Sequence, residues 1–283
     1  MSKIELKNLT KIYGKTKALD NVSLTFEENK IYGLLGRNGA GKSTMLDIIS
    51  NRIFPTSGEA DLDGENISEN AKALSKIYSM SDKTLYPPAM RIKEAIKITA
   101  GYYPNFNIEY AMGLAKLFEL DINKKISRLS TGYSSIYKII LALSCNAEVV
   151  MFDEPVLGLD ANHRSLFNKE LLKHYSEAPS TLIISTHLIE EAADIIEKVV
   201  IIKNGKVVMD DDTETILSKG YSVSGASSVV DEFTKGKEVL GADVLGGLKT
   251  AYILGKCEKS EVPDSLELSK IDLQTLFIQL TNV

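Results

Sequence analysis

The feature that most constrains this chain is a glycine-rich segment between an apolar strand and a helix. Ile31–Leu35 is a short apolar run typical of a buried strand, and residues 36–43 follow it as Gly-Arg-Asn-Gly-Ala-Gly-Lys-Ser. Residues 44–53 then have the pattern of a helix. Glycines let a backbone turn so that successive N–H groups point at one anion, and the positive end of the next helix adds to the attraction. This order of strand, loop and helix predicts a site for nucleotide phosphates.

Several positions of this loop have an expected contact. Lys42 would reach the β- and γ-phosphates, Ser43 would hold Mg²⁺, and Thr44 would line the α-phosphate. The other loop positions expected to contact the nucleotide are Gly36, Asn38, Gly39 and Gly41. The alternative is a glycine-rich turn that binds nothing, and the strand and helix on either side argue against it. A guanine reader of the form Asn-Lys-x-Asp is not found, because residues 123–126 read Asn-Lys-Lys-Ile.

A second apolar strand ends in two neighbouring carboxylates. Val-Val-Met-Phe at residues 149–152 leads into Asp153 and Glu154. Asp153 would bind Mg²⁺ through water, and Glu154 would polarise an attacking water as general base. Adjacent side chains at a strand end point in different directions, so the two carboxylates can have separate roles. Such a strand end alone is a common polar turn, but together with the glycine loop it predicts phosphoryl chemistry.

His187 lies between an apolar strand at 182–185 and a predicted helix at 188–198. A lone histidine is usually structural. In parallel sheets, however, ligands bind beyond the carboxyl ends of the strands, which is where this histidine is expected. We therefore expect His187 to contact the γ-phosphate. His163 and His174 have no such context and are interpreted as surface residues.

Strand and helix patterns alternate over the first part of the chain, which predicts an α/β fold with a mostly parallel sheet. Runs at 4–9 and 22–26 indicate antiparallel strands beside that sheet. Residues 85–135 have helical periodicity and predict an inserted helical subdomain. We expect a main domain over residues 1–217 and a small C-terminal α/β domain over 218–283, with a regulatory or dimerising role.

Composition excludes several other classes of protein. The chain has 283 residues, a formal net charge of −5 and two cysteines. The acidic balance disfavours nucleic acid as a partner, and two cysteines far apart in sequence do not make a disulfide framework or a metal site. The first residues alternate charged and apolar side chains, unlike a signal peptide, and no run of about 18 apolar residues is long enough for a membrane span. We therefore expect a cytoplasmic location.

The ordered set of motifs resembles the ATP-binding subunit of ABC transporters over roughly residues 1–217. Leu-Ser-Thr-Gly-Tyr at 129–133 stands where that family has its signature sequence. Asp160 matches the D-loop aspartate, His187 the switch histidine, and Tyr13 the aromatic residue that stacks on adenine. The family's usual glutamine after the next strand is absent, and Asp82 is our choice for its metal-binding equivalent, with Ser81 as the alternative. The resemblance implies a P-loop NTPase core, with ATP and Mg²⁺ as cofactors.

In this family, ATP is held between two subunits. The resemblance therefore implies that Ser130 and the Gly132 backbone contact the γ-phosphate bound by a second ATPase subunit. It also implies a separate transmembrane permease and a position at the cytoplasmic face of the membrane. The family's permease docks beside the helical subdomain, where this chain has Leu85, Tyr86 and an aromatic run at 102–106. The alternative is that these aromatic residues pack inside the subdomain.

Three functions follow from the resemblance. The first is an ATPase that powers a permease, with the bacterial export branch, which carries drugs, peptides or amphipathic toxins, as the expected class. The second is an ABC ATPase without a permease, acting in translation or cofactor assembly. The third is a regulatory subunit that binds ATP and hydrolyses it poorly. The changed signature favours pairing with a paralogue over pairing with an identical chain.

Overall fold

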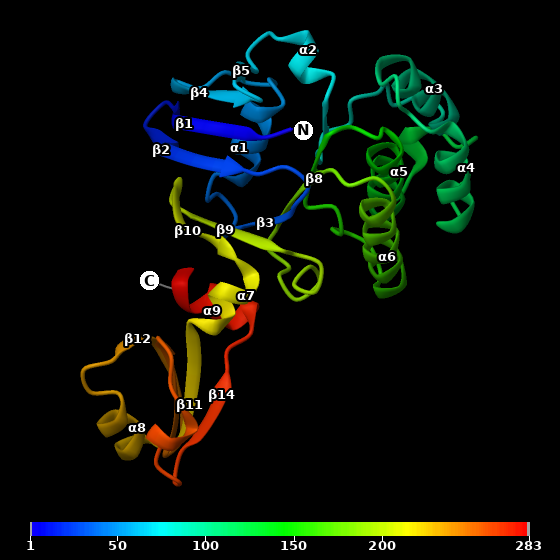
Figure 1. The fold of residues 1–283 in the computed structure, drawn as a ribbon. Helices are drawn as coiled ribbons and strands as arrows, with labels where there is room; N and C mark the ends of the chain where they lie inside the picture. The colour runs from blue at the N-terminus through cyan, green and yellow to red at the C-terminus, as the bar shows by residue number, and fades with distance from the viewer. Residues whose placement is uncertain (1, 282–283) are drawn as a thin grey trace. The chain divides into compact units, whose positions relative to one another are not determined.

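The structure is a computed structural model that describes residues 2–281 (Figure 1). Contacts within the chain divide it into two compact units, which we describe separately. The first unit comprises residues up to Ile196 together with Val200–Met209, and the second comprises Glu197–Val199 and the residues from Asp210 onward. The domain limits expected from sequence, 1–217 and 218–283, stay predictions.

The first unit contains two sheets. The larger has six strands in the order β10-β9-β3-β8-β7-β6, and β3, β8, β7 and β6 run parallel. The smaller is antiparallel, in the order β2-β1-β4-β5. The strands of the larger sheet are β3 (Ile31–Leu35), β6 (Ile77–Met80), β7 (Val149–Asp153), β8 (Thr181–Thr186), β9 (Lys198–Lys203) and β10 (Lys206–Asp212). Those of the smaller sheet are β1 (Ile4–Tyr13), β2 (Thr16–Phe26), β4 (Ser57–Leu62) and β5 (Glu65–Asn66).

Helix α1 follows β3 and shares a single apolar core with both sheets. Met45 and Ile49 of α1 are buried in one cluster with Phe26 and Leu62 of the antiparallel sheet and Met151 of the parallel sheet. The helical elements of the first unit follow one another along the chain. They are α1 (Lys42–Ile49), α2 (Ala71–Leu74), α3 (Ile92–Tyr102), α4 (Ile108–Leu117), the 3₁₀ turn η1 (Ile126–Arg128), α5 (Thr131–Ser144) and α6 (Ala161–Glu177). The α/β class, the parallel sheet, the antiparallel strands and the helical insertion between β6 and β7 are confirmed.

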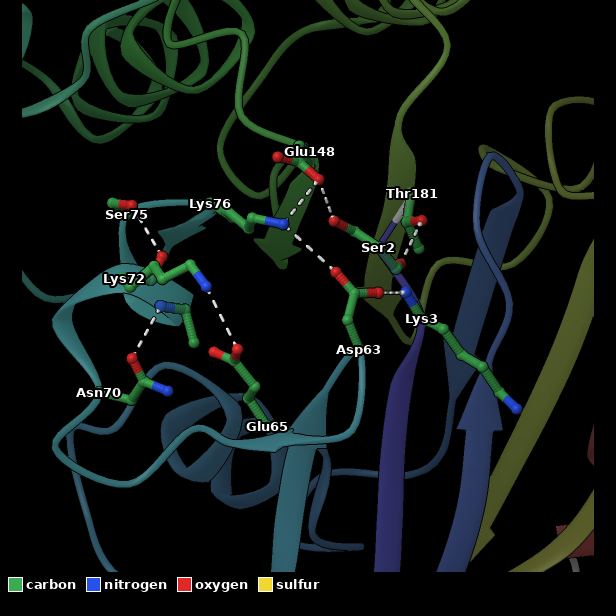
Figure 2. A network of polar contacts seen from close by, with 11 residues as sticks. Ser2, Lys3, Asp63, Glu65, Asn70, Lys72, Ser75, Lys76, Glu148 and Thr181 are labelled. Carbon is green, nitrogen blue, oxygen red and sulfur yellow. Dashed lines mark hydrogen bonds and ion pairs between the residues drawn. The ribbon is translucent and has the colours of Figure 1, made fainter.

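Polar contacts join the antiparallel sheet to the amino-terminal edge of the parallel sheet (Figure 2). The Lys76 ammonium lies 3.3 Å from Asp63, which follows β4, and 3.4 Å from Glu148, which precedes β7. Glu148 also accepts a hydrogen bond from Ser2, and the Ser2 carbonyl accepts one from Thr181 at the start of β8. This network lies at the edge opposite the carboxyl ends of the strands, so it fixes the two sheets together without occupying that edge.

The second unit is a small α/β body with its own core. Its four strands are antiparallel in the order β12-β13-β11-β14, and Val223, Val230, Ala251 and Ile253 are buried against one of its faces. Its elements are α7 (Thr213–Ser218), β11 (Gly220–Ala226), α8 (Ser227–Phe233), β12 (Glu238–Leu245), β13 (Leu248–Leu254), η2 (Lys259–Glu261), β14 (Glu267–Lys270) and α9 (Leu273–Thr281). The predicted C-terminal α/β extension is confirmed.

Two expectations were wrong. Residues 188–198 form no helix, and instead residues 190–195 form turns before β9 begins at Lys198. The apolar spacing there reflects burial of Ile189 and Ala192, and the hydrogen bonds from the Ala192 and Ala193 amides to the Ile189 carbonyl form turns rather than a continuous helix. His174 is buried rather than on the surface, because α6 turns it inward against the ring of Tyr110, and its pKa is lowered by burial.

Candidate active site

The predicted site residues converge on the carboxyl edge of the parallel sheet. Strand register pairs Leu35 at the end of β3 with Thr186 at the end of β8, and Asp153 at the end of β7 with Ser185. The glycine loop, the two carboxylates and His187 therefore start from three adjacent strand ends. Ligands of open α/β sheets bind at such an edge, beyond the carboxyl ends of the strands.

The loop after β3 requires its glycines. Gly39 and Gly41 have φ angles of +82° and +115°, in the left-handed region that side chains disfavour. A Cβ on Gly41 would lie 2.4 Å from the Ala18 carbonyl oxygen, and one on Gly36 would lie 2.7 Å from the Ile202 carbonyl oxygen. Gly41 caps α1 without a side-chain hydrogen bond, so the first amides of the helix are left for an anion.

Lys42 is held inside the loop rather than extended into solvent. Its side chain is 6% exposed, and its ammonium donates to the Gly36 carbonyl at 2.6 Å and lies 3.7 Å from Glu154 Oε1. Burial lowers the pKa of Lys42, and the negative charges of Glu154 and Asp153 oppose that effect. The ammonium is therefore positioned under the glycine loop, where a phosphate group would strengthen its charged form.

Asp153 and Ser43 face each other across the strand end. The Asp153 carboxylate accepts a hydrogen bond from the Ser185 hydroxyl at 2.8 Å and is hydrogen-bonded to Ser43. Burial raises the pKa of Asp153, and those two hydroxyl contacts and Lys42 work against the rise. Such a pair of oxygen ligands suits Mg²⁺, which uses one or two protein groups and takes its other ligands from phosphates and water. Residues 2–281 contain no cluster of three or more His, Cys, Asp or Glu that could hold a metal ion.

Glu154 and His187 form a contact pair beside Lys42. Nδ1 of His187 lies 2.9 Å from Oε1 of Glu154, and the Thr186 hydroxyl donates to Oε2 at 3.3 Å. The Glu154 backbone has a φ of +50° and its amide donates to the Ser185 carbonyl at 2.8 Å, so the main chain turns sharply here. Each oxygen of the Glu154 carboxylate is therefore held by its own partner, and this carboxylate points in a different direction from that of Asp153.

Ser185 and Thr186 are site residues to which the sequence analysis gave no role. Each places a hydroxyl on one of the two adjacent carboxylates. The signal in the sequence was two hydroxyl residues at the carboxyl end of a buried strand. Their partners could not be read from it, because the pairing depends on β8 lying next to β7 in register.

The signature segment is part of a helix start. The Ser130 hydroxyl caps α5 by accepting from the Tyr133 amide at 3.3 Å. A Cβ on Gly132 would lie 2.6 Å from the Gly158 carbonyl oxygen, and the Ser135 hydroxyl donates to the Leu157 carbonyl at 3.0 Å. The signature end of α5 is therefore packed against the turn that leads from Glu154 to Asp160.

Asp160 caps the next helix, α6. Its carboxylate accepts from the His163 amide at 2.9 Å and lies 2.9 Å from His163 Nδ1. These contacts of His163 lower the pKa of Asp160. The carboxylate is largely exposed, so it is both fixed by the helix and accessible to a second chain.

The remaining predicted residues lie on the surface or past other strands. Tyr13, at the end of β1, is 49% exposed with the Lys11 ammonium 5.1 Å from its ring centre. Asp82 is exposed, and within residues 2–281 no described hydrogen bond or ion pair joins it to Asp153. Ser81 is buried directly past β6, the strand next to β7, and its hydroxyl has no described partner. Asn38 and Thr44 lie in the loop and the first turn of α1.

Comparison with known proteins agrees with this geometry. The family model described as ABC transporter matches residues 19–157. The bacitracin transport ATP-binding protein BcrA of Enterococcus faecalis is 33% identical over 209 residues, which cover 72% of this chain and 68% of BcrA. The chain belongs to the ABC transporter family. This cassette is also 33% identical to the ABC transporter ATP-binding protein YtrB of Bacillus subtilis over 188 aligned residues. The aligned residues make up 66% of this chain and 64% of YtrB.

Solved structures place the fold in the same family. The ATP-binding cassette MJ0796, solved as a dimer in a post-hydrolysis state with ADP and Pi, matches with a TM-score of 0.66 and 26% identity. The match covers 74% of this chain and 98% of MJ0796. The P-loop NTPase fold of an ABC ATPase cassette is thereby confirmed. None of the helices in residues 2–281 has the length and apolar character that crossing a bilayer requires.

The buried carboxylate of Asp153 generates a stability prediction. Since burial raises its folded-state pKa, the ionised group costs folding free energy above the ordinary carboxyl pKa, and this cost grows until the folded pKa is passed. Asp153→Asn keeps an acceptor for Ser185 and removes the charge. We expect it to raise the nucleotide-free melting midpoint at pH 7 by about 1–3 °C, with the gain vanishing near pH 4.

The matched control is Asp160→Asn, which also keeps a helix cap. Because contacts with His163 lower the pKa of Asp160, its charge stabilises the folded state and its removal is not expected to raise the midpoint. Thermal unfolding followed by circular dichroism at pH 4 and pH 7 measures both. An Asp153→Asn protein that melts lower than wild type at pH 7 contradicts the prediction.

Proposed function

We propose that this cassette binds and hydrolyses ATP to power a separate membrane permease from the cytoplasmic face. The observation that carries the proposal is the convergence of Lys42, the Ser43–Asp153 pair and the Glu154–His187 pair on one sheet edge. Phosphate binding, metal binding and activation of water each have a group in place there. The relatedness to BcrA, named for bacitracin transport, and to MJ0796, solved with ADP and Pi, supports the same assignment.

Nucleotide binding is assigned to the loop and the first turn of α1. The amides from Gly36 to Thr44 surround the phosphates, and Lys42 exchanges its Gly36 contact for the β- and γ-phosphate oxygens. Tyr13 offers an exposed ring face for adenine. Ser43 and Asp153 would hold Mg²⁺, which when bound neutralises charge between the two terminal phosphates.

The hydrolytic step is assigned to Glu154 and His187. Glu154 accepts a proton of the attacking water as the water oxygen bonds to the γ-phosphorus, while the bond from that phosphorus to the β–γ bridging oxygen breaks and ADP leaves. His187 Nδ1 fixes the carboxylate and leaves its other ring nitrogen to contact a γ-phosphate oxygen. Thr186 holds the second carboxylate oxygen, so the base keeps one orientation while the nucleotide enters.

A second ATPase subunit completes each site. Ser130, Gly132 and Asp160 are fixed by the starts of two helices, and within the described chain none of them is hydrogen-bonded to the loop residues around Lys42. We propose that they contact the nucleotide held by the partner subunit, identical or paralogous. The dimeric form of MJ0796 supports such pairing. ATP then acts as a ligand that holds two cassettes together until its γ-phosphate is lost.

The permease contact is assigned to a groove beside the helical insertion. This groove has a volume of about 560 Å³ and lies between β6, α2 and α3. Leu85 and Tyr102 on its rim are 61% and 76% exposed, while Tyr86 is held by a 2.6 Å hydrogen bond to Thr99 and Tyr103 by one of 2.9 Å to the Ile77 carbonyl. An apolar groove with an exposed aromatic rim suits a helix of a membrane partner. We propose export of a drug, peptide or amphipathic toxin, supported by the relatedness to BcrA.

The general-base assignment is tested by Glu154→Gln. The amide keeps the contacts with His187 and Thr186 but cannot take a proton, so we expect ATP turnover to fall by about 10²–10⁴-fold. Binding of a fluorescent ATP analogue is expected to stay within about twofold of wild type, since no phosphate ligand is lost. Turnover is measured by phosphate release, and turnover at the wild-type rate refutes the role of Glu154.

The role of Ser130 in the second subunit's site is tested by Ser130→Asp. Aspartate is as good a helix cap as serine, so α5 is preserved, but its negative charge opposes a γ-phosphate. We expect ATP-dependent dimerisation of a Glu154→Gln protein to be lost, as measured by size-exclusion chromatography. Ser130→Asn, which keeps the cap without the charge, is expected to dimerise more than Ser130→Asp. Equal dimerisation of all three proteins contradicts the assignment.

Docking of the permease is tested by Tyr102→Ala. Its exposed ring has no described hydrogen bond in residues 2–281, so its removal leaves the cassette folded while reducing the groove's apolar rim. We expect co-purification with the membrane partner to fall by about tenfold, and ATP affinity to stay unchanged. Ile108→Ala, an exposed apolar residue of the same helical insertion outside the groove, is the control. Equal losses in both variants contradict docking at the groove.

A further inference from the structure

A short segment connects the edge of the nucleotide site to the docking groove. Residues 81–84 follow β6, whose last residue Met80 pairs with Phe152, the residue before Asp153. Leu85 and Tyr86 at the other end of the segment line the groove. The segment is therefore the direct covalent route between two regions to which the proposed function assigns nucleotide and partner.

Helix α5 holds this segment through two consecutive side chains. The Lys138 ammonium donates to the Ser81 carbonyl at 3.0 Å and to the Asp82 carbonyl at 2.6 Å. The neighbouring Tyr137 is buried, with its hydroxyl hydrogen-bonded to Thr84. Segment 81–84 is thus attached to α5 at both of its ends.

The attachment is strong because it is made by a charge in a partly buried place. Hydrogen bonds from a charged donor to carbonyls are stronger than neutral ones, and exclusion of water strengthens them further. Burial lowers the pKa of Lys138, and the nearby Asp82 charge opposes this. Burial also raises the pKa of Tyr137 to about 12, so its hydroxyl stays protonated.

Helix α5 carries the signature residues at its other end. Ser130 caps this helix, whose 14 residues form one rigid element with Tyr137 and Lys138 two turns further on. We propose that Lys138 is a positioning residue that ties segment 81–84 to α5, so that the docking groove, the edge of the nucleotide site and the signature end of α5 move together. The inference rests on the proposed function and adds a residue that couples its parts.

The test places a fluorescent probe in the groove. Leu85→Cys in a Cys257→Ser background gives one reactive thiol, because Cys145 is only 1% exposed. Labelled full-length protein is titrated with Mg·ATP in a Glu154→Gln background, and both the probe signal and ATP affinity are measured. We expect Lys138→Met to reduce the amplitude of the ATP-dependent signal by about fivefold, with ATP affinity within about twofold.

Three variants separate positioning from a general structural role. Lys138→Arg keeps a charged donor and is expected to preserve the signal amplitude. Lys169→Met removes an exposed lysine of α6 and is expected to change nothing. Tyr137→Phe is an isosteric change that removes only the Thr84 contact, and it is expected to reduce the amplitude even if Lys138→Met folds poorly.

The outcomes distinguish this inference from the function on which it rests. An unchanged amplitude in both Lys138→Met and Tyr137→Phe overturns the coupling, as does a parent protein that binds ATP without any change at position 85. A parent protein that does not bind ATP overturns the proposed function, and the inference with it. A loss of signal in Lys138→Met that Lys138→Arg avoids supports the positioning role.

Discussion

The burial of one ammonium group at the carboxyl edge of the parallel sheet sets the conditions for the rest of the site. Lys42 is nearly inaccessible, and its charge is balanced by the Gly36 carbonyl and by Glu154. A buried charge without partners would be strongly unfavourable, so the loop must approach closely and the carboxylates must lie nearby. The glycines make that approach possible, because side chains at Gly36 and Gly41 would collide with backbone carbonyls of other strands. A nucleotide's phosphates are the anionic partner that such an arrangement can accept.

Residues assigned to recognition are held by helix ends and strand ends rather than by free loops. Ser130 and Asp160 each cap a helix, and Asp153 and Glu154 each accept a hydroxyl from the next strand. A side chain that is already fixed by hydrogen bonds in the fold has one orientation. Binding therefore costs less conformational entropy, because that side chain does not have to be ordered again. The opposing effect comes from the buried carboxylate of Asp153. Its raised pKa indicates that the ionised group destabilises the folded state, so the protein is less stable than it would be without this charge.

Most of the fold could be predicted because its patterns are local. The apolar runs of β3, β7 and β8 and the glycine loop define a parallel α/β core without reference to other segments. Residues 188–198 show where this fails, since their apolar spacing is met by turns in which Ile189 and Ala192 are buried. Periodicity reports which side chains are buried and does not decide how the backbone between two strands is hydrogen-bonded. The surface position predicted for His174 was wrong for a related reason. Tyr110, the residue that covers it, lies on another helix.

The sequence by itself determined which residue types stand at the ends of the strands: a glycine loop around Lys42, two adjacent carboxylates and a histidine beyond the next strand. Those residue types act through local spacing, so they can be identified without coordinates. Only the tertiary structure decided which groups meet. Ser185 reaches Asp153, Thr186 reaches Glu154, and Lys138 reaches the segment after β6 because strand order and helix packing bring distant segments together. Contacts between residues far apart in sequence depend on register and packing, which no local pattern encodes.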